Sequence, residues 1–510
     1  MTSQRIGIID IGSNSIRLVV YERTENGAHR VVDGSKRSAR LSSKIDDNGA
    51  LPGDAINELI DTLKHFIRIC SLHAIDRIRA VATAAIRNAT NQPYILKKIN
   101  KETGLSIELL SGKEEAEYGF LGMINSLQVS EGYLIDIGGG STEVSLFRNR
   151  ILLQTISLPF GCVSLNQKND AKEQIDTKNL ESIEKLVLGA LKQHKWIFHA
   201  PNLPLIGVGG TVRALGKVHQ ALNSYPLAQT HNYNIEGSQV ENLFQLMLAL
   251  PLDQRRKLPG LSKDRADVIV PGVAVLRAIF RATRASHYKI CGAGLRDGLF
   301  HATRFPNHSK QDNPLTFSLS NLSALHTEAP RQHVKQVNRL AKQLFNELYV
   351  HEQIDPAIRV LLDAASQLYR IGASIDYYDY AKHSFYLIIH SHLNGLSHRE
   401  IVMTAAIASF KSKGRAKELL APYRSLITIA DLDLICKLGV LLQLSAALDR
   451  SESQSIRQLA IRITGNHLIL LPLHPRGSLA VEIHEVEELA SDFKKQWGLS
   501  PILKQYEGHT

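Results

Sequence analysis

The feature that most constrains the fold is a short motif that occurs twice in the chain. Ile8–Ser15 reads IIDIGSNS and Leu134–Ser141 reads LIDIGGGS. Each copy combines an apolar strand, an aspartate at the strand's end, and a glycine-rich turn with hydroxyl or amide side chains. The alternating sequences that follow, IRLVVYE from Ile16 and TEVSLF from Thr142, indicate a second strand after each turn. The motif therefore predicts a duplicated β-hairpin unit.

The remaining periodicity indicates several domains. Leu205–Thr211 (LIGVGGT) is a third apolar segment that ends in glycines, and strand and helix patterns alternate to about Phe300, which favours α/β layers. The polar segment FPNHSKQDNP, residues 305–314, is expected to be a linker. From there to about Arg450 the apolar spacing is helical. Beyond it, QLAIRITGNHLILLPL and SLAVEIHEV both alternate, which predicts a small terminal β unit.

Composition excludes several classes of protein. Apolar residues at 44% and charged residues at 21% are typical of a folded chain rather than a disordered or fibrous one. The four cysteines have no C-x-x-C spacing, which argues against a disulfide scaffold and a thiolate zinc site. This cysteine usage fits a reducing cytoplasm. No window approaches about 18 uninterrupted apolar residues, so we expect no transmembrane segment.

Phosphate is the ligand that these turns suggest. A glycine-rich turn brings backbone N–H groups close to an anion, and an aspartate at the strand end is oriented to hold a divalent cation. Glycines in hairpins more often serve only a positive φ, so a single turn is weak evidence. Two copies with matching Asp10 and Asp136, together with GVGGT, predict turns on opposite walls of one cleft.

Two further segments carry candidate residues. Ser111–Ala116 (SGKEEA) begins a predicted helix near Ser111, so Glu114 and Glu115 either favour the positive helix end or serve chemistry. The segment VATAAIRNATN leads from a strand into a helix start, where Thr83 and Arg87 are placed to meet a phosphate. The residues alone leave both readings of the glutamates open.

The basic residues are concentrated in one part of the chain. The net charge is +11, and Pro251–Arg304 holds eleven basic against four acidic residues. Arg277, Arg281 and Arg284 share one face if Gly272–Ala285 is helical. Such a face is either a solvated helix surface or a field that steers an anionic substrate, nucleic acid or a membrane surface. Charge alone does not choose between these readings.

Taken in order, these motifs resemble one enzyme family. DIGSNS, ATAAIRNATN, SGKEEA, DIGGGSTE, PFGCVSL, GVGGT and ADVIVPG are similar to motifs of the exopolyphosphatase and guanosine pentaphosphatase family over about the first 300 residues. The resemblance implies two ribonuclease-H-like domains of the actin and sugar-kinase type around a cleft, residues 1–128 and 129–304. An all-helical HD-like domain, residues 315–455, and a small C-terminal α+β unit, residues 456–510, are expected to follow.

The resemblance also implies a chemistry, the Mg²⁺-dependent hydrolysis of terminal phosphoanhydrides. Glu115 matches the family's water-activating glutamate, and Glu143 completes the catalytic acidic set. The implied magnesium ligands are Asp10, Asp136 and Glu143. The implied substrate-binding residues are Gly12, Ser13, Asn14, Ser15, Arg87, Gly138, Gly139, Gly140, Ser141, Thr142, Gly209, Gly210 and Thr211.

The helical part resembles an HD-type phosphohydrolase domain with a changed metal site. His333, His383 and Asp449 fall at flanking positions, but Tyr369 and Arg370 replace the adjacent His-Asp pair. A phenol and a guanidinium cannot do the work of that pair, so we expect a metal-free relic that shapes a channel or a dimer contact.

We therefore expect a homodimeric exopolyphosphatase that releases orthophosphate from inorganic polyphosphate by in-line attack of a Glu115-activated water, and that does not bind nucleic acid. The basic loop with Lys411, Lys413, Arg415 and Lys417 is a further candidate contact for long chains, if it is not merely exposed. The alternatives are a guanosine pentaphosphate 5'-phosphohydrolase, an actin-like or sugar-kinase-like ATP-using enzyme, and a non-enzymatic guanosine-nucleotide sensor; guanosine penta- or tetraphosphate is a further candidate partner.

Overall fold

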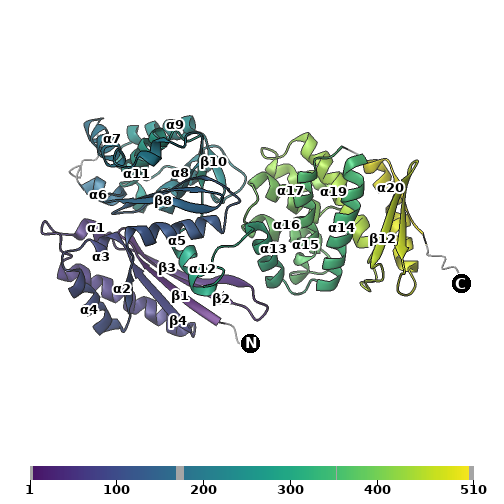
Figure 1. Ribbon diagram of the computed structural model, residues 1–510, viewed down its shortest axis with the longest axis horizontal. Helices are drawn as coiled ribbons and strands as arrows, with labels where there is room; N and C mark the ends of the chain where they lie inside the picture. Colours follow the sequence, from purple (N-terminus) through teal and green to yellow (C-terminus); the bar gives the residue numbers. More distant parts are fainter. Residues whose placement is uncertain (1–3, 168–176, 352, 505–510) are drawn as a thin grey trace. The chain divides into compact units, whose positions relative to one another are not determined.

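The computed structural model describes residues 4–167, 177–351 and 353–504, which divide between two units, Met1–Pro314 and Leu315–Thr510 (Figure 1). Each unit has its own sheet or sheets and its own buried core. Among the described residues, no helix is long and apolar enough to cross a membrane.

The first unit begins with a five-stranded sheet whose strands lie in the order β3-β2-β1-β4-β5. The first three, β1 (Gln4–Ile11), β2 (Ser15–Arg23) and β3 (His29–Ser38), form an antiparallel meander, and β4 (Arg77–Ala82) and β5 (Ile107–Leu109) run parallel to β1. The helices of this part are α1 (Leu41–Lys44), α2 (Gly53–Leu72), α3 (Ala84–Arg87) and α4 (Gln92–Thr103).

The second sheet repeats this topology. Its order is β10-β11-β9-β6-β7-β8, so that β8, β7, β6, β9 and β11 correspond to β3, β2, β1, β4 and β5. Its strands are β6 (Gly132–Ile137), β7 (Thr142–Arg148), β8 (Ile151–Leu158), β9 (Leu205–Val208), β10 (Tyr233–Ile235) and β11 (Tyr288–Ile290). Ile137 pairs with Thr142 across its hairpin as Ile11 pairs with Ile16 across the first, which confirms the predicted duplication.

Apolar helices build the core of the second sheet. They are α6 (Cys162–Gln167), α7 (Thr177–Leu191), α8 (Gly209–Leu222), α9 (Gly237–Ala249), α10 (Leu252–Arg255) and α11 (Ile269–Thr283). The predicted helix around Gly272–Ala285 is α11, which ends one residue before Arg284, whose backbone adopts the left-handed conformation.

Two crossing helices join the halves of this unit (Figure 1). Phe120 and Met123 of α5 (Gly112–Ile124) pack into the core of the second sheet, whereas Phe300 of α12 (Leu295–Arg304) packs against the first. A Cβ atom at Gly122 would overlap the Gly294 carbonyl, so the two backbones touch and glycine is required. Each sheet is thus covered in part by a helix that follows the other sheet in the chain.

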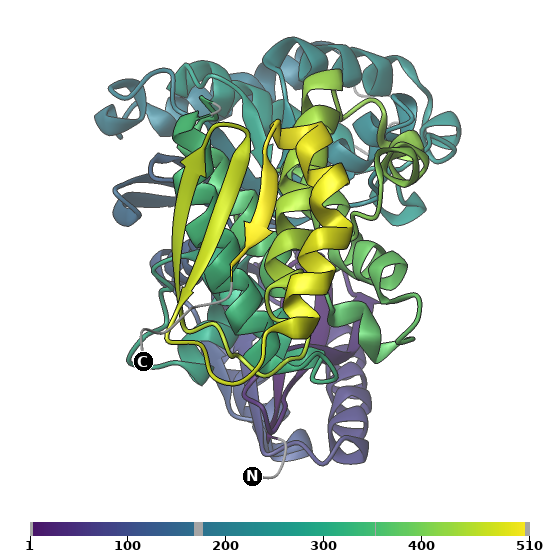
Figure 2. The same ribbon diagram turned by 90° about the vertical axis from the view of Figure 1, so that its right-hand side faces the viewer.

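The second unit is helical up to a small terminal sheet (Figure 2). Its helices are α13 (Pro314–Leu325), α14 (Arg331–His351), α15 (Arg359–Leu368), α16 (Tyr380–His390), α17 (His398–Ala408), α18 (Lys413–Leu420) and α19 (Ile429–Ala447). The terminal elements are β12 (Gln458–Thr464), β13 (His467–Leu473), α20 (Ala480–Trp497) and β14 (Ser500–Leu503). The helical periodicity and the strands of QLAIRITGNHLILLPL are confirmed.

One element was predicted wrongly. SLAVEIHEV, expected as a strand, forms the start of α20. Leu479, Glu482 and Val486 are buried at helical spacing, while Val481, which strict alternation would bury beside Leu479, is 51% exposed. Over the nine residues of SLAVEIHEV the strand and helix periods are hard to tell apart, and the later buried residues Phe493 and Trp497 continue the helical one.

Two histidines of the first unit make its stability depend on pH. Burial lowers the pKa of His29, on β3, and of His301, on α12, to about 4 in each case, because the charged imidazolium loses its hydration. In the unfolded chain a histidine titrates near 6.5, so the unfolded state binds more protons between about pH 4 and 6.5. Acidification through this window therefore favours unfolding.

We predict that each histidine costs on the order of 2 kcal/mol of unfolding free energy between pH 7.5 and 4.5. His301→Gln should reduce this loss, measured by urea unfolding and Trp196 fluorescence in a Trp497→Phe background, which leaves one tryptophan. His65→Gln, at an exposed position of α2, is the control. Equal pH dependence in His301→Gln and the parent protein would contradict the assignment.

Candidate active site

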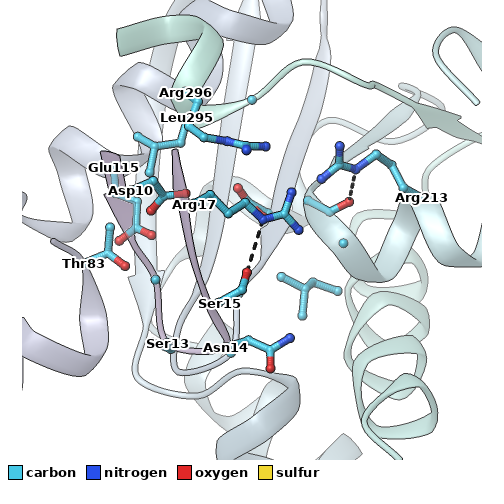
Figure 3. A pocket seen from close by; sticks show the side chains of 18 of the residues that line it. Asp10, Ser13, Asn14, Ser15, Arg17, Thr83, Glu115, Arg213, Leu295 and Arg296 are labelled. Carbon is cyan, nitrogen blue, oxygen red and sulfur yellow. Dashed lines mark hydrogen bonds between the residues drawn. The ribbon is translucent and has the colours of Figure 1, made fainter. Parts of the chain in front are cut away.

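The predicted turns meet at one pocket in the first unit, with a volume of about 130 Å³ (Figure 3). Asp10 and Asp136 lie near the ends of β1 and β6, and Gly209 and Gly210 follow β9. Because these strands occupy equivalent positions in their sheets, their ends bring the glycine turns of both halves to the same cleft.

The two glycine turns have the same closing hydrogen bond. Gly12 N–H donates to the Ser15 carbonyl at 3.2 Å, and Gly138 N–H donates to the Ser141 carbonyl at 3.0 Å. A Cβ atom at Gly139 would lie 3.0 Å from the backbone nitrogen of Asn14. None of these turn glycines has a positive φ. Close approach of the two turns, and not a left-handed backbone, explains the glycine at 139.

The start of α6 supports the second turn from behind. Cys162 N–H donates to the Gly138 carbonyl, and the N–H groups of Val163 and Ser164 donate to the Gly139 carbonyl, each at 3.0 Å. In a trans peptide the N–H group that follows a carbonyl points the opposite way. The amides of Gly139 and Gly140 therefore point away from α6, as a turn that binds an anion requires.

Buried carboxyl groups occupy one part of the site. Asp10, Asp136 and Glu115 line the pocket, and Glu143 lies buried beside them, where it accepts a hydrogen bond from Ser157 Oγ at 2.8 Å. Burial raises the pKa of all four groups, to about 6 for Asp136 and about 7 for Glu115. Mutual repulsion adds to the effect at Glu115, Asp136 and Glu143.

The two adjacent glutamates of SGKEEA have different tasks. Glu114 caps α5: its carboxylate accepts from Ser111 N–H at 2.8 Å, and Ser111 Oγ accepts from Glu114 N–H at 3.2 Å. Glu115, one residue on, faces the pocket and accepts a hydrogen bond from Arg87 at 3.0 Å. The capping interpretation is therefore correct for Glu114 but not for Glu115, which lines the pocket.

Four arginines from separate elements line the same pocket: Arg17, Arg213, Arg265 and Arg296. Figure 3 shows Arg17, Arg213 and Arg296 around the space beside Asp10 and Glu115. Burial, with repulsion from Arg296 and Arg213, lowers the pKa of Arg17 to about 10. Among the described residues, none forms a hydrogen bond or ion pair with the guanidinium of Arg265 or Arg296. This crowding of positive charge suits an anionic ligand.

Several of the predicted site residues do not line the pocket. Gly140 packs on Ser13, Thr142 Oγ1 donates to the Phe160 carbonyl at 2.8 Å, and Thr211 is buried in the core side of α8. Arg87 binds Glu115 and the Leu110 carbonyl and is absent from the described lining. Their predicted contacts with substrate stay predictions.

The basic stretch Pro251–Arg304 contributes residues to the site, but these do not come from the helical face that carries Arg277 and Arg281. Arg277 pairs with Glu241 at 2.6 Å, and Arg281 pairs with Glu184 and Glu241, so that face is a paired helix surface. Arg265 and Arg296, from the same stretch, reach the pocket instead. Sequence reasoning missed them as individual site residues, along with Arg17 and Arg213.

The oxygen atoms at the pocket meet one requirement for binding a hard cation such as Mg²⁺. Among the described residues, no group of three or more histidine, cysteine, aspartate and glutamate side chains is placed to hold a metal ion. Mg²⁺, however, usually takes only one or two carboxylates together with phosphates and water. Asp10 and Asp136 supply two such carboxylates at one pocket, and the buried Oδ1 atom of Asn14 has no hydrogen-bond partner there.

Family models match both units. Residues 19–304 match the Ppx/GppA phosphatase family, and residues 319–476 match domain III of Ppx/GppA phosphatases. The chain belongs to the Ppx/GppA phosphatase family. It is 30% identical over 407 residues to the guanosine-5'-triphosphate,3'-diphosphate pyrophosphatase of Vibrio vulnificus, covering 78% of this chain and 79% of the relative. The enzyme of the same name from Vibrio campbellii is 29% identical over 410 residues, with the same coverage.

Solved structures of the family share the fold. The Aquifex aeolicus family member is 26% identical, with a TM-score of 0.52, and the alignment covers 60% of this chain and 100% of that one. An exopolyphosphatase from Cytophaga hutchinsonii is 22% identical, with a TM-score of 0.56 and the same coverage. The family match confirms the α/β fold of the actin-like ATPase type for the first unit.

Of the HD-like residues, His333, Tyr369 and Arg370 line a cavity of about 490 Å³ in the second unit, whereas His383 and Asp449 are not among its described lining residues. The Tyr369 hydroxyl bonds to His333 Nε2, and His333 Nδ1 lies 2.8 Å from an Asp449 carboxylate oxygen. Arg370 forms an ion pair with Glu452. Both ring nitrogens of His333 are thus engaged, which leaves neither for a metal. The assignment of this unit as HD-like stays a prediction.

A substitution behind the second turn tests whether its position matters. A Cβ atom at Gly161 would lie 2.5 Å from the Gly138 carbonyl oxygen, so Gly161→Ala must displace the turn. We predict a fall in phosphatase kcat/KM of about 100-fold, as expected for misplacing a binding loop by about 1 Å. Gly189→Ala, where a Cβ atom meets nothing within 4 Å, is the control. A Gly161→Ala protein that is folded and fully active would contradict this role.

Proposed function

We propose that the protein is an exopolyphosphatase, which hydrolyses the terminal phosphoanhydride of inorganic polyphosphate. The observation that carries the proposal is the lining of the pocket, where four arginines and two glycine turns surround the space and no aromatic side chain is present among the described lining residues. Such a lining offers charge and N–H groups to a bare phosphate chain and no ring on which a purine base stacks.

Hydrolysis of guanosine pentaphosphate is the second candidate. The specific observation in its favour is the 30% identity to a relative named guanosine-5'-triphosphate,3'-diphosphate pyrophosphatase, over 78% of this chain. Both substrates end in a phosphoanhydride, so the same chemistry would hydrolyse either of them. The two candidates therefore differ in the leaving group, which is the part of the substrate that remains after the terminal phosphate is released.

In the proposed mechanism the terminal phosphate lies between the turns Gly12–Ser15 and Gly138–Ser141. The turn amides and the arginines stabilise the negative charge on its oxygens, and positioning supplies most of the catalysis. Glu115 accepts a proton from the attacking water. Its pKa of about 7 suits a general base near neutral pH, and Arg87 holds the carboxylate in place.

Mg²⁺ is part of this proposal. Asp10 and Asp136 would hold it, and Glu143, buried beside Glu115, would complete the acidic set. When bound, the ion would neutralise charge on the phosphate oxygens. Its positive charge would also favour the ionised forms of the two aspartates, whose pKa values burial raises.

Glu115→Gln tests the general base. The amide keeps the shape of the side chain but cannot accept a proton, so we predict a fall in kcat of about 100-fold or more with little change in substrate affinity. Glu114→Gln, which alters the helix cap and not the pocket, is the matched control and should keep most activity. Near-normal kcat in Glu115→Gln would place the base elsewhere.

The substrate is tested by comparing kcat/KM for long-chain polyphosphate and for guanosine pentaphosphate, each with Mg²⁺. The proposal predicts the higher value for polyphosphate. A clear preference for the nucleotide would make the second candidate correct. Formation of ADP from ATP that depends on an acceptor would indicate a kinase, and nucleotide binding without turnover would indicate a sensor.

A further inference from the structure

The two halves of the first unit are ion-paired beside the pocket. Lys36 Nζ lies 2.6 Å from Asp264 Oδ2. The Arg40 guanidinium makes two hydrogen bonds to the Asp267 carboxylate, at 2.6 and 3.1 Å, and a third to the Asp264 carbonyl at 3.1 Å. Lys36 and Arg40 belong to the first half, and Asp264 and Asp267 to the second. We call these two ion pairs the strap.

The segment that the strap holds contains a residue that lines the pocket. Arg265 lies between Asp264 and Asp267 in sequence, and its side chain lines the pocket. A Cβ atom at Gly210 would overlap the Arg265 guanidinium, so this group lies directly on the backbone of the third glycine turn. Since its guanidinium has no hydrogen bond or ion pair among the described residues, the position of Arg265 depends on its backbone segment.

The other end of the strap is attached to the first phosphate turn. The N–H groups of Ala39 and Arg40 donate to the Asn14 carbonyl at 3.1 and 2.9 Å. Arg40 also adopts the left-handed conformation, with φ of 47°, where a residue other than glycine is uncommon. A continuous chain of hydrogen bonds therefore links Asn14 through Arg40 to the segment that carries Arg265.

The strap is stronger than an ordinary surface pair. The Arg40–Asp267 contact is bidentate, and the side chains are 38% and 22% exposed. A bidentate arginine–carboxylate pair in this partly buried position outweighs a single exposed lysine contact. Lys36 reinforces the same segment, and its hydrogen bond lowers the pKa of Asp264 to about 2.

We propose that Arg40 and Asp267 are positioning residues for the phosphatase reaction. The strap holds the two halves so that Arg265 faces the first phosphate turn across the terminal phosphates of an anionic substrate. This inference rests on the proposed function in assuming a phosphoanhydride substrate, and it applies equally to either candidate substrate. The two residues act through Arg265 and do not themselves touch the substrate.

A double-mutant cycle on inorganic tripolyphosphate hydrolysis tests this coupling. Arg40→Gln and Asp267→Asn should each lower kcat/KM about tenfold, mainly through KM, and Arg40→Lys should recover part of the loss. In an Arg265→Gln background, Arg40→Gln should cost less than about twofold, because its effect passes through Arg265. Lys44→Gln, which removes the Lys44–Glu58 pair within the first half, is the control. Full additivity of Arg40→Gln and Arg265→Gln would overturn the proposal.

A distance measurement tests the strap without catalysis. The four native cysteines are buried, so spin labels can be attached at Asp47→Cys and Lys257→Cys, exposed positions on the two halves. Arg40→Gln should lengthen or broaden the distance distribution, and Lys44→Gln should not. An unchanged distance distribution in Arg40→Gln would show that these ion pairs do not hold the two halves in position. It would overturn the proposal whether or not the enzyme is active. If Arg40→Gln changes the distance distribution while the parent protein hydrolyses neither tripolyphosphate nor the nucleotide, the strap is retained and the proposed function is refuted.

Discussion

The structure of the site depends on two sets of ionisable groups of opposite sign, buried or partly buried carboxyl groups and partly buried arginines, gathered at one pocket. Four carboxyl groups lie in or beside one pocket with pKa values raised by burial, and four arginines line the same pocket, where Arg17 has a lowered pKa. Burying either set without a partner is unfavourable. Under the proposed function, a phosphate anion bound together with a divalent cation would provide a partner for both sets.

The duplicated sheets create that arrangement. Two equivalent strands end at one cleft, and each has an aspartate next to its last residue, followed by a turn closed by the same hydrogen bond. The turns approach so closely that Gly139 has no room for a side chain beside Asn14. Contact between α5 and α12, also through glycines, and the ion pairs of the strap join the halves elsewhere. The positions of the two glycine turns are thus fixed by contacts from both halves.

Local patterns allowed much of this to be predicted. The repeated motif predicted the hairpins, and SGKEEA predicted a helix that begins near Ser111 but left the roles of Glu114 and Glu115 open. The structure places Glu114 in the helix cap and Glu115 at the pocket. The arginines could not be found in this way, because Arg17, Arg213, Arg265 and Arg296 meet only after the chain has folded. Net charge identified the right stretch, but its most regular face, Arg277 and Arg281, pairs with glutamates of α7 and α9. The prediction of a strand at the start of α20 was wrong, because a short alternating run fits both the strand period and the helix period.

The central claim is that both glycine turns bind the same terminal phosphate. The most direct test is a crystal structure of the Glu115→Gln protein with Mg²⁺ and inorganic tripolyphosphate. The account predicts the terminal phosphate between Gly12–Ser15 and Gly138–Ser141, with oxygens bonded to amides of both turns and to Arg265 or Arg296. A phosphate chain bound to one turn only, or bound outside this pocket, would contradict the account.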